Sequence, residues 1–425
     1  MSRWIVVGTA LFVACAASPP APAASEPDAA GATAADAAAD ASDGDGSATA
    51  ATADATVAPL AEDFAEAWQQ GVADHLGQAK IATETTEAGV STFEFDVKSG
   101  PICLRGDPFR MAIRDAKSDD LLIFLQGGGA CWSTFCLAIQ KAPAGIPKLD
   151  VLDPNRESNP FKAWNIVYLP YCDGSMFAGD ADTDDDKDGK LDRQQHGLQN
   201  LSAALDVAIA HFPKPARIVL AGSSGGGFGT IPAVLLVRKL WPKAEILLVQ
   251  DSGTGTGKTG DPAFLQNLVK EFHVERFLPA SCLDCKTSPH LTPLLAWELA
   301  RDAHLRVAAF SSYRDSIMAD VFLKIAPELF KVGLLEATTP LHAAFPTRYK
   351  RFFIDDTMHT TMLGDASGLV GKDLTAVTLP PDALVALGGL VLGSIDTTKL
   401  GEVTVAQWLA AARDGTAAWQ DLLAP

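Results

Sequence analysis

The sequence lacks several features that would place it in common functional classes. No apolar run reaches the roughly 18 to 20 residues that a membrane-spanning helix needs. Basic residues are few, since 34 Lys and Arg stand against 52 Asp and Glu, for a net charge of −18. This disfavours nucleic-acid binding, which needs clustered Lys and Arg. The single C-x-x-C, Cys282 to Cys285, has no second C-x-x-C and no H-x-x-x-H partner, which disfavours a zinc site.

Length and composition are those of a soluble globular protein. The 425 residues provide for one large domain or two modest ones, and 48% hydrophobic residues allow a sizeable core. The seven acids and one base of residues 1–60 leave residues 61–425 with a net charge of −12. We therefore expect the folded part to be acidic and to repel polyanionic substrates at low salt.

The N-terminal segment is typical of an export signal. Arg3 precedes an apolar stretch, residues 4–14, which predicts a signal peptide over residues 1–15. FVAC, residues 12–15, resembles a bacterial lipobox, so Cys15 is the predicted lipidation site. Cleavage near residues 21–23 is the alternative and would discard Cys15. The chain is expected at the cell envelope on a lipid anchor, otherwise secreted or periplasmic. Residues 16–60, almost entirely Ala, Pro, Ser, Thr, Gly and Asp without Lys or Arg, predict a disordered linker.

Residues 61–425 show the pattern of one α/β domain. Short apolar runs bounded by turn residues predict strands buried on both faces of a mainly parallel sheet. These runs are 121–125, 165–169, 216–221, 244–249, 306–310 and 351–354. Helices are expected at 62–76, 198–211, 231–240 and 294–303, and further strands at 91–97 and 111–113. The prediction is a doubly wound α/β-hydrolase-like fold without internal repeats.

The sharpest motif is GSSGGG, residues 222–227, between a predicted strand and a predicted helix. It matches G-x-S-x-G with Ser224 at the centre, the nucleophile elbow whose glycines allow a sharp turn. The alternative is a phosphate loop, but the Walker lysine and the G-x-G-x-x-G spacing are missing here. A second glycine cluster, residues 127–129, also follows a strand. Such a loop supplies backbone N–H groups to an oxyanion hole, so Gly128, Gly129 and Gly225 are the predicted donors.

Three motifs in order carry a family resemblance: IFLQGGG (123–129), WNIVYLPYCDGS (164–175) and GSSGG (222–226). Together they resemble the pectin acetylesterase family, which includes plant cell-wall esterases and animal Notum-type carboxylesterases. The resemblance spans roughly residues 90–415 and implies an α/β-hydrolase-type esterase that needs no cofactor for catalysis. It also implies a disulfide between Cys103 and Cys172. Cys131–Cys136 and Cys282–Cys285 are the local pairings that remain, as expected of an exported chain.

A catalytic serine needs a base and an orienting acid, which follow it in this fold in the order Ser, Asp or Glu, His. His359 follows the last predicted buried strand, where the family has a His-Cys-Gln segment. Asp315 matches the family's Tyr-Asp-Ser-type segment with Arg314 inserted, and Asp251 is the competing acid. The other histidines after Ser224 fit the strand order less well: His273, His290, His304 and His342.

An acidic segment, residues 180–192, stands apart from the esterase motifs. Asp184-x-Asp186-x-Asp188-Gly189 matches the start of an EF-hand-type loop, with Lys190 and Asp192 at positions seven and nine. Position twelve is Gln195 rather than the bidentate Glu. The alternatives are a structural calcium site and a solvated acidic loop.

These observations predict an exported serine carboxylesterase that removes acetyl or other short acyl groups, on acylated polysaccharide as partner. Two alternatives stay open: a longer-chain, Notum-type or lipase-like carboxylesterase, and a surface-displayed non-catalytic binding protein on a hydrolase fold. No nucleic acid is expected as a partner, and a membrane is expected only through the lipid anchor. A local basic groove would change the charge argument, and four arginines lie near the motifs: Arg105, Arg110, Arg314 and Arg348.

Overall fold

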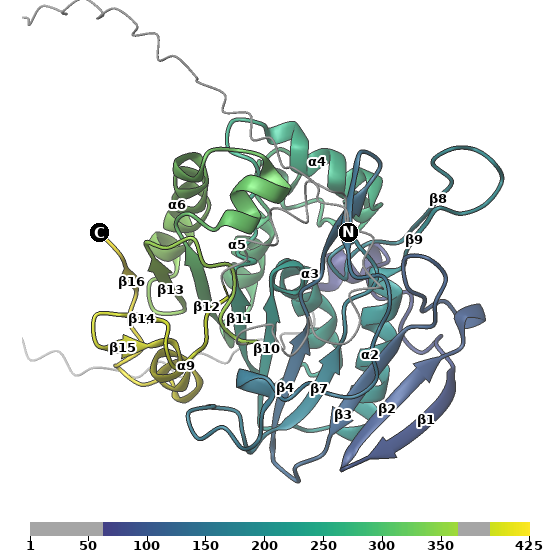
Figure 1. The fold of residues 1–425 in the computed structure, drawn as a ribbon, viewed down its shortest axis with the longest axis horizontal. Helices are drawn as coiled ribbons and strands as arrows, with labels where there is room; N and C mark the ends of the chain where they lie inside the picture. The colour runs from purple at the N-terminus through teal and green to yellow at the C-terminus, as the bar shows by residue number, and fades with distance from the viewer. Residues whose placement is uncertain (1–62, 364–391) are drawn as a thin grey trace, which may run out of the picture. The chain divides into compact units, whose positions relative to one another are not determined.

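The computed structural model describes residues 63–363 and 392–425 (Figure 1). The predicted signal peptide with Cys15 and the predicted linker lie outside these residues. Across the described part of the chain, no helix combines the length and the apolar character that crossing a membrane requires.

A ten-stranded sheet forms the centre of the fold, in the order β1-β2-β3-β7-β4-β10-β11-β12-β13-β16 (Figure 1). All pairs from β7 to β16 are parallel, and β1, β2 and β3 extend one edge in antiparallel fashion. The strand bounds are β1 Ile81–Glu87, β2 Val90–Phe95, β3 Arg110–Arg114, β4 Asp120–Leu125, β7 Asn165–Leu169, β10 Arg217–Ser223, β11 Glu245–Asp251, β12 Leu305–Ser312, β13 Tyr349–Ile354 and β16 Leu422–Leu423. The predicted α/β class with a mainly parallel sheet is confirmed.

Alternate side chains of the central strands pack into two cores, one on each face of the sheet. Leu121, Ile123 and Leu125 of β4 join the core beneath α2, α3, α5 and α6, while Leu122 and Phe124 join the core beneath α9. This two-sided burial explains the uninterrupted apolar runs of the sequence. The helix bounds are α1 Ala65–Gln69, α2 Gly197–His211, α3 Gly225–Leu240, α4 Pro262–Glu271, α5 Thr292–Arg301, α6 Pro327–Ala344 and α9 Val405–Asp414.

Three two-stranded pieces lie outside the main sheet. β5 (Gly129–Trp132) pairs with β6 (Phe135–Ala138), β8 (Ala181–Thr183) with β9 (Arg193–Gln195), and β14 (Lys399–Leu400) with β15 (Val403–Thr404). The first two pairs come next to each other at the site described below.

Two predicted helices are wrong in their extent, and the one expected over 231–240 begins at Gly225. The helix expected over 62–76 is helical only in α1, because Gly71 adopts a φ of +95° that a right-handed helix does not accommodate. Strand β1 has no counterpart among the predicted strands. All seven of its residues are exposed, so it has none of the apolar alternation that marks a half-buried strand.

Candidate active site

Ser224 sits in a strained turn between β10 and α3. Its φ of 53° is rare for a residue with a side chain, and its N–H donates to the Asp251 carbonyl at 2.7 Å. A Cβ on Gly222 would overlap the Gly226 carbonyl, and one on Gly226 would overlap the Leu125 carbonyl. The turn is therefore built from backbone in direct contact with backbone, and it presents the serine at the carboxyl edge of the parallel strands.

The structure brings Ser224, His359 and Asp315 together from three segments. His359 Nε2 lies 2.8 Å from Ser224 Oγ, and His359 Nδ1 lies 2.9 and 2.8 Å from the two Asp315 carboxylate oxygens. With Nδ1–H donating to the carboxylate, Nε2 is free to accept the serine proton. Asp315 follows β12 and is fully buried, and His359 follows β13 and is 5% exposed.

The Asp315 carboxylate is held from its own backbone side as well. Its Oδ1 accepts the N–H groups of Ile317 and Met318, at 3.1 and 3.0 Å. These residues begin the π-helical segment Ile317–Leu323. The acid is thus fixed in orientation by the turn that follows it.

Asp251, the competing acid, has other partners. Its carboxylate accepts hydrogen bonds from Ser223 Oγ at 2.8 Å and from the N–H groups of Thr361 and Met362, at 3.0 and 2.9 Å. The side chain is fully buried, and this desolvation raises its pKa to about 6. Asp251 therefore anchors the segment that follows His359 and ties it to the strand below Ser224.

The four other histidines after Ser224 bond elsewhere. His273 faces the Asp180 carbonyl, and His304 pairs with Glu245. His290 Nδ1 accepts the Gly257 N–H at 3.0 Å, and burial lowers the pKa of His290. His342 Nδ1 lies 2.9 Å from the Tyr349 carbonyl. Among the hydrogen bonds of the described residues, the Ser224 hydroxyl is reached by the imidazole of His359 and by none of these four.

The predicted oxyanion donors lie around the serine turn. Gly225 is the first residue of α3, so its N–H has no partner within the helix. Gly129 has a φ of +89°, and a Cβ there would overlap the Leu137 carbonyl. A Cβ on Gly128 would overlap the Tyr171 ring. Gly129 and Gly225 line the same cavity as Ser224, whereas Gly128 is not among the residues that line it.

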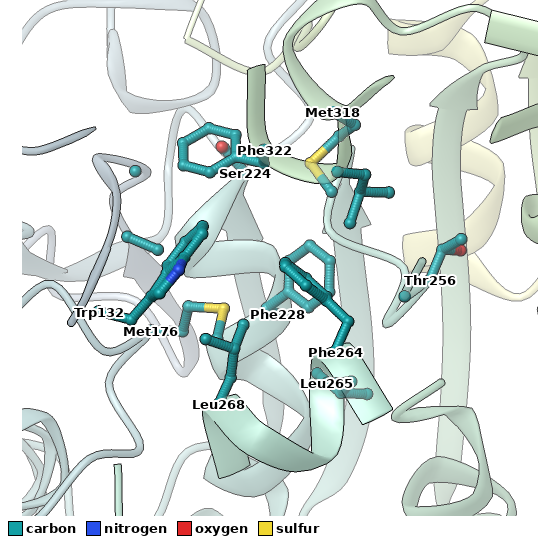
Figure 2. Close-up of a pocket in the computed structure, with 15 residues that line it drawn as sticks. Trp132, Met176, Ser224, Phe228, Thr256, Phe264, Leu265, Leu268, Met318 and Phe322 are labelled. Carbon is teal, nitrogen blue, oxygen red and sulfur yellow. The ribbon is translucent and has the colours of Figure 1, made fainter. Parts of the chain in front are cut away.

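A cavity of about 510 Å³, counting its open mouth, begins at Ser224 (Figure 2). Its side chains are nearly all apolar and come from β5, α3, α4, the π-helical segment and the loops that contain Met176 and Thr256. They include Trp132, Met176, Phe228, Phe264, Leu268 and Phe322. None of these was predicted as a site residue, because an apolar pocket wall and a core have the same composition in sequence.

Comparison with known proteins gives a family. Residues 82–290 match the family model described as Pectinacetylesterase. That segment belongs to the pectinacetylesterase family. Two Arabidopsis thaliana proteins, Pectin acetylesterase 11 and Pectin acetylesterase 4, are each 26% identical to the chain, over 214 and 185 residues. The alignments cover 45% and 39% of this chain and 54% and 44% of theirs, so the chain spans about half the length of these relatives.

The pectinacetylesterase segment contains some of the predicted site residues and not others. Ser224 and the three glycines lie within residues 82–290, whereas Asp315 and His359 lie beyond its end. The geometry of the acid and the base is therefore a separate observation from the family match.

All six cysteines that were expected to form disulfides do so, in the predicted pairs. Cys103–Cys172 joins residues 69 apart in sequence and lies within the pectinacetylesterase segment. Cys131–Cys136 joins directly opposed residues of the β5–β6 hairpin, and Cys282–Cys285 closes a short turn.

The acidic loop gathers three of its predicted ligands. Carboxylate oxygens of Asp184, Asp186 and Asp188 lie within 4.8 Å of one another. Asp192 instead accepts the Asp185 N–H at 2.8 Å, and the Lys190 ammonium pairs with Asp188 at 3.2 Å. Calcium binding stays a prediction from the sequence, and comparing melting temperatures with millimolar calcium and with chelator tests it.

Proposed function

We propose that the protein is an exported serine carboxylesterase that hydrolyses acetyl or other short acyl esters. The observation that carries the proposal is the hydrogen-bonded chain from Ser224 through His359 to Asp315. This chain ends at a strained serine turn with glycine N–H groups beside it. Nucleophile, base and orienting acid in this arrangement are what acyl transfer requires.

The reaction follows from the geometry. Ser224 Oγ attacks the ester carbonyl carbon while His359 Nε2 takes the hydroxyl proton, and Asp315 stabilises the imidazolium. The N–H groups of Gly129 and Gly225, with Gly128 beside them, stabilise the negative oxygen of the tetrahedral intermediate. The C–O bond to the alcohol then breaks, and His359 returns the proton to the departing oxygen. A water molecule, deprotonated by His359, releases the acyl group as the free acid and restores the serine.

The proposed substrate is an acetylated polysaccharide. The support is the family segment, whose named relatives are pectin acetylesterases. Three disulfides support an exported location, because such bonds persist in oxidising compartments. No cofactor enters the proposed mechanism.

A second candidate is an esterase for longer acyl chains. An acetyl group fills only the end of the cavity at Ser224, whereas the apolar lining continues to Leu265 and Leu268 of α4 (Figure 2). Such a lining favours an alkyl chain by burying apolar surface, at about 0.8 kcal/mol per CH₂ group.

Turnover of p-nitrophenyl acetate, butyrate and octanoate by the wild type and by Ser224→Ala tests the proposal. We expect turnover by the wild type that Ser224→Ala loses. A maximum at acetate supports the acetylesterase, and a maximum at octanoate supports the second candidate. Absence of Ser224-dependent turnover on all three esters would leave the non-catalytic binding protein as the better interpretation.

A further inference from the structure

The cavity beside Ser224 has two walls that come from separate parts of the chain. One is the β5–β6 hairpin, which contributes Trp132, and the other is helix α4, which contributes Phe264, Leu265 and Leu268. The Trp132 and Phe264 rings meet edge to face, with centroids 5.8 Å apart. The distance between hairpin and helix therefore sets the shape of the pocket away from the reacting atoms.

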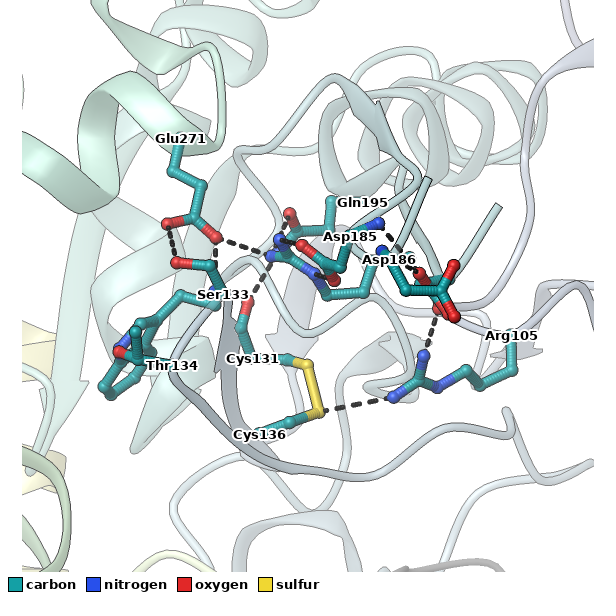
Figure 3. Close-up of polar contacts among 12 residues, drawn as sticks. Arg105, Cys131, Ser133, Thr134, Cys136, Asp185, Asp186, Gln195 and Glu271 are labelled. Atoms are coloured by element: carbon teal, nitrogen blue, oxygen red, sulfur yellow. Dashed lines mark hydrogen bonds and ion pairs between the residues drawn. A yellow bond between two sulfur atoms is a disulfide. The ribbon is translucent and has the colours of Figure 1, made fainter. Parts of the chain in front are cut away.

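A polar bridge between Ser133 and Glu271 joins the same two walls (Figure 3). Ser133, at the hairpin tip, donates its N–H and its hydroxyl to the two carboxylate oxygens of Glu271, at 2.5 and 3.0 Å. Glu271 is the last residue of α4, and Ser133 directly follows Trp132. The bridge thus acts on the residue next to the pocket tryptophan.

Arg193 also fixes the Glu271 carboxylate. Its guanidinium donates to Glu271 at 2.7 Å and, through two nitrogens, to both oxygens of Asp185 at 2.7 and 2.6 Å. Only 3% of the Arg193 side chain is exposed. A buried cation needs such partners, and the fork of an arginine matches two carboxylates in a fixed geometry. Arg193 is therefore committed to orienting Glu271, and it is not free to bind ligand.

The base of the hairpin has contacts besides this bridge, and one of them also involves Arg193, which donates to the Gln195 side-chain oxygen at 3.2 Å. The Cys131–Cys136 disulfide closes it, the Cys131 N–H donates to the Gly174 carbonyl at 2.8 Å, and the Gln195 amide donates to the Cys131 carbonyl at 2.7 Å. Loss of the bridge should therefore release the tip with Trp132, while Gly129 at the base keeps its place beside Ser224.

We propose that Glu271 and Arg193 are positioning residues that set the acyl-chain selectivity of the pocket. They hold the hairpin tip against α4, so that Trp132 and Phe264 form a closed apolar wall for acyl chains longer than acetyl. The proposal rests on the proposed esterase function. Binding of an acyl chain long enough to reach this wall depends on the position of the wall, whereas binding of an acetyl group at Ser224 does not.

The test is the ratio of kcat/KM for p-nitrophenyl octanoate to that for p-nitrophenyl acetate. Glu271→Gln keeps the size of the side chain but removes its charge, and Arg193→Lys keeps the charge but loses the fork. We expect each to lower the octanoate-to-acetate ratio by about fivefold or more, mainly through KM for octanoate. Ser133→Ala keeps the backbone hydrogen bond and should change the ratio in the same direction by less.

Asp421→Asn is the matched control. Asp421 pairs with the equally buried Arg351 through two oxygens, at 3.1 and 2.8 Å, and neither residue lines the pocket. This variant should lower the melting temperature while both esters change together. A ratio for Glu271→Gln and Ser133→Ala within twofold of wild type, or matching that of the control, overturns the positioning proposal. If the wild type shows no Ser224-dependent turnover on either ester, the proposed function itself has failed.

Discussion

At the scale of single residues, two buried aspartates near Ser224 have different tasks because their partners differ. Asp315 is paired with the imidazole of His359, whereas Asp251 accepts from the hydroxyls of Ser223 and Thr361 and from backbone N–H groups. The first arrangement orients a base, and the second anchors the loop that carries it. Strand order in the sequence favours Asp315 over Asp251 as the orienting acid, and the hydrogen-bond partners in the structure agree with that choice.

Removal of either the nucleophile or the base should abolish most ester turnover. Ser224→Ala and His359→Ala each break the same chain of proton transfer, so the double variant should lose little more than either single one. Steady-state turnover of p-nitrophenyl acetate measures this. Losses that multiply in the double variant would contradict a single catalytic unit.

Asp315→Asn should cost far more activity than Asp251→Asn. An amide at 315 no longer holds the imidazole in the tautomer that accepts the serine proton, a change worth roughly 10⁴-fold in kcat in serine proteases. An amide at 251 would point its NH₂ group at the hydroxyl and N–H donors that the carboxylate now accepts from. This displaces the loop after His359 and should lower kcat by about 10²-fold or less. Comparison of kcat for the two variants decides between them, and the opposite ranking would reassign the acid.

Asp251 should also give a measurable dependence of stability on pH. Its pKa in the folded protein, about 6, lies above the ordinary 3.8, so the folded state binds the proton more tightly than the unfolded state. Its contribution to stability is therefore smallest above pH 6 and grows as the pH falls from about 6 to about 4. The unfolding free energy of the wild type minus that of Asp251→Asn should therefore rise by up to about 3 kcal/mol as the pH falls over this interval.

Urea denaturation of both proteins at pH 4, 5 and 6 measures that difference. Because the other titrating groups are common to both proteins, they cancel in the comparison. A difference that stays constant, or that shrinks toward pH 4, would contradict the raised pKa.

The three residues of the proposed catalytic chain could be selected from the sequence because local motifs and strand order point to them. Ser224 has its glycines next to it, and His359 and Asp315 follow buried strands whose apolar runs are plain in the sequence. The true partners of Asp251, Thr361 and Met362, were not predictable, since they lie 110 and 111 residues away with no marking motif.

At the scale of elements, the predictability of each one follows its burial. Strand β7 is buried along its whole length, and its predicted bounds, 165–169, are those of the structure. Strand β1 is wholly exposed and was missed. Helix α4 was missed as well. It buries only Leu265 and Leu268, and these two line the cavity together with Phe264. A helix is recognised in a sequence by apolar residues on its buried face and polar residues on its exposed face. A helix that forms a pocket wall shows this alternation less clearly.

The Cys103–Cys172 disulfide should be the most stabilising of the three. It closes the longest loop, and in the chain-entropy model a separation of 69 residues contributes about 4 kcal/mol. Replacing both cysteines by alanine should lower the free energy of unfolding by about that amount. The matched control is the same replacement at Cys282 and Cys285, three residues apart, where the model gives about 2 kcal/mol.

Chemical denaturation of the two double variants compares these contributions. Thiol titration of the unfolded, unreduced wild-type residues 61–425 should find no free cysteine. A free thiol there, or equal losses in the two variants, would contradict the assignment.

At the scale of the whole molecule, charge bears on the choice of polysaccharide. Residues 61–425 carry −12, and the four arginines near the motifs are already engaged. Arg110 pairs with Glu94 and Arg314 with Asp355, while Arg105 and Arg348 donate to backbone carbonyls. A basic groove for a polyanion is therefore not formed by these residues.

Acetylated xylan, which is neutral, should be deacetylated at least as fast as acetylated pectin at low salt. Repulsion slows encounter with an anionic polymer, and salt screens it with a Debye length of about 8 Å at physiological ionic strength. Added salt should therefore raise the rate on pectin relative to that on xylan. Acetate release at 10 and 150 mM NaCl measures both effects, and a strong preference for pectin at low salt would contradict the charge argument.

The contact of backbone with backbone at the serine turn has a consequence for how the protein can diversify. Gly222 and Gly226 have no space for a Cβ, whereas Trp132, Phe264 and Leu268 line the pocket with ordinary, exchangeable side chains. In a randomised library, the glycine positions should therefore be recovered unchanged while the pocket positions drift. New substrate preferences are then accessible by substitutions that leave the reacting atoms untouched.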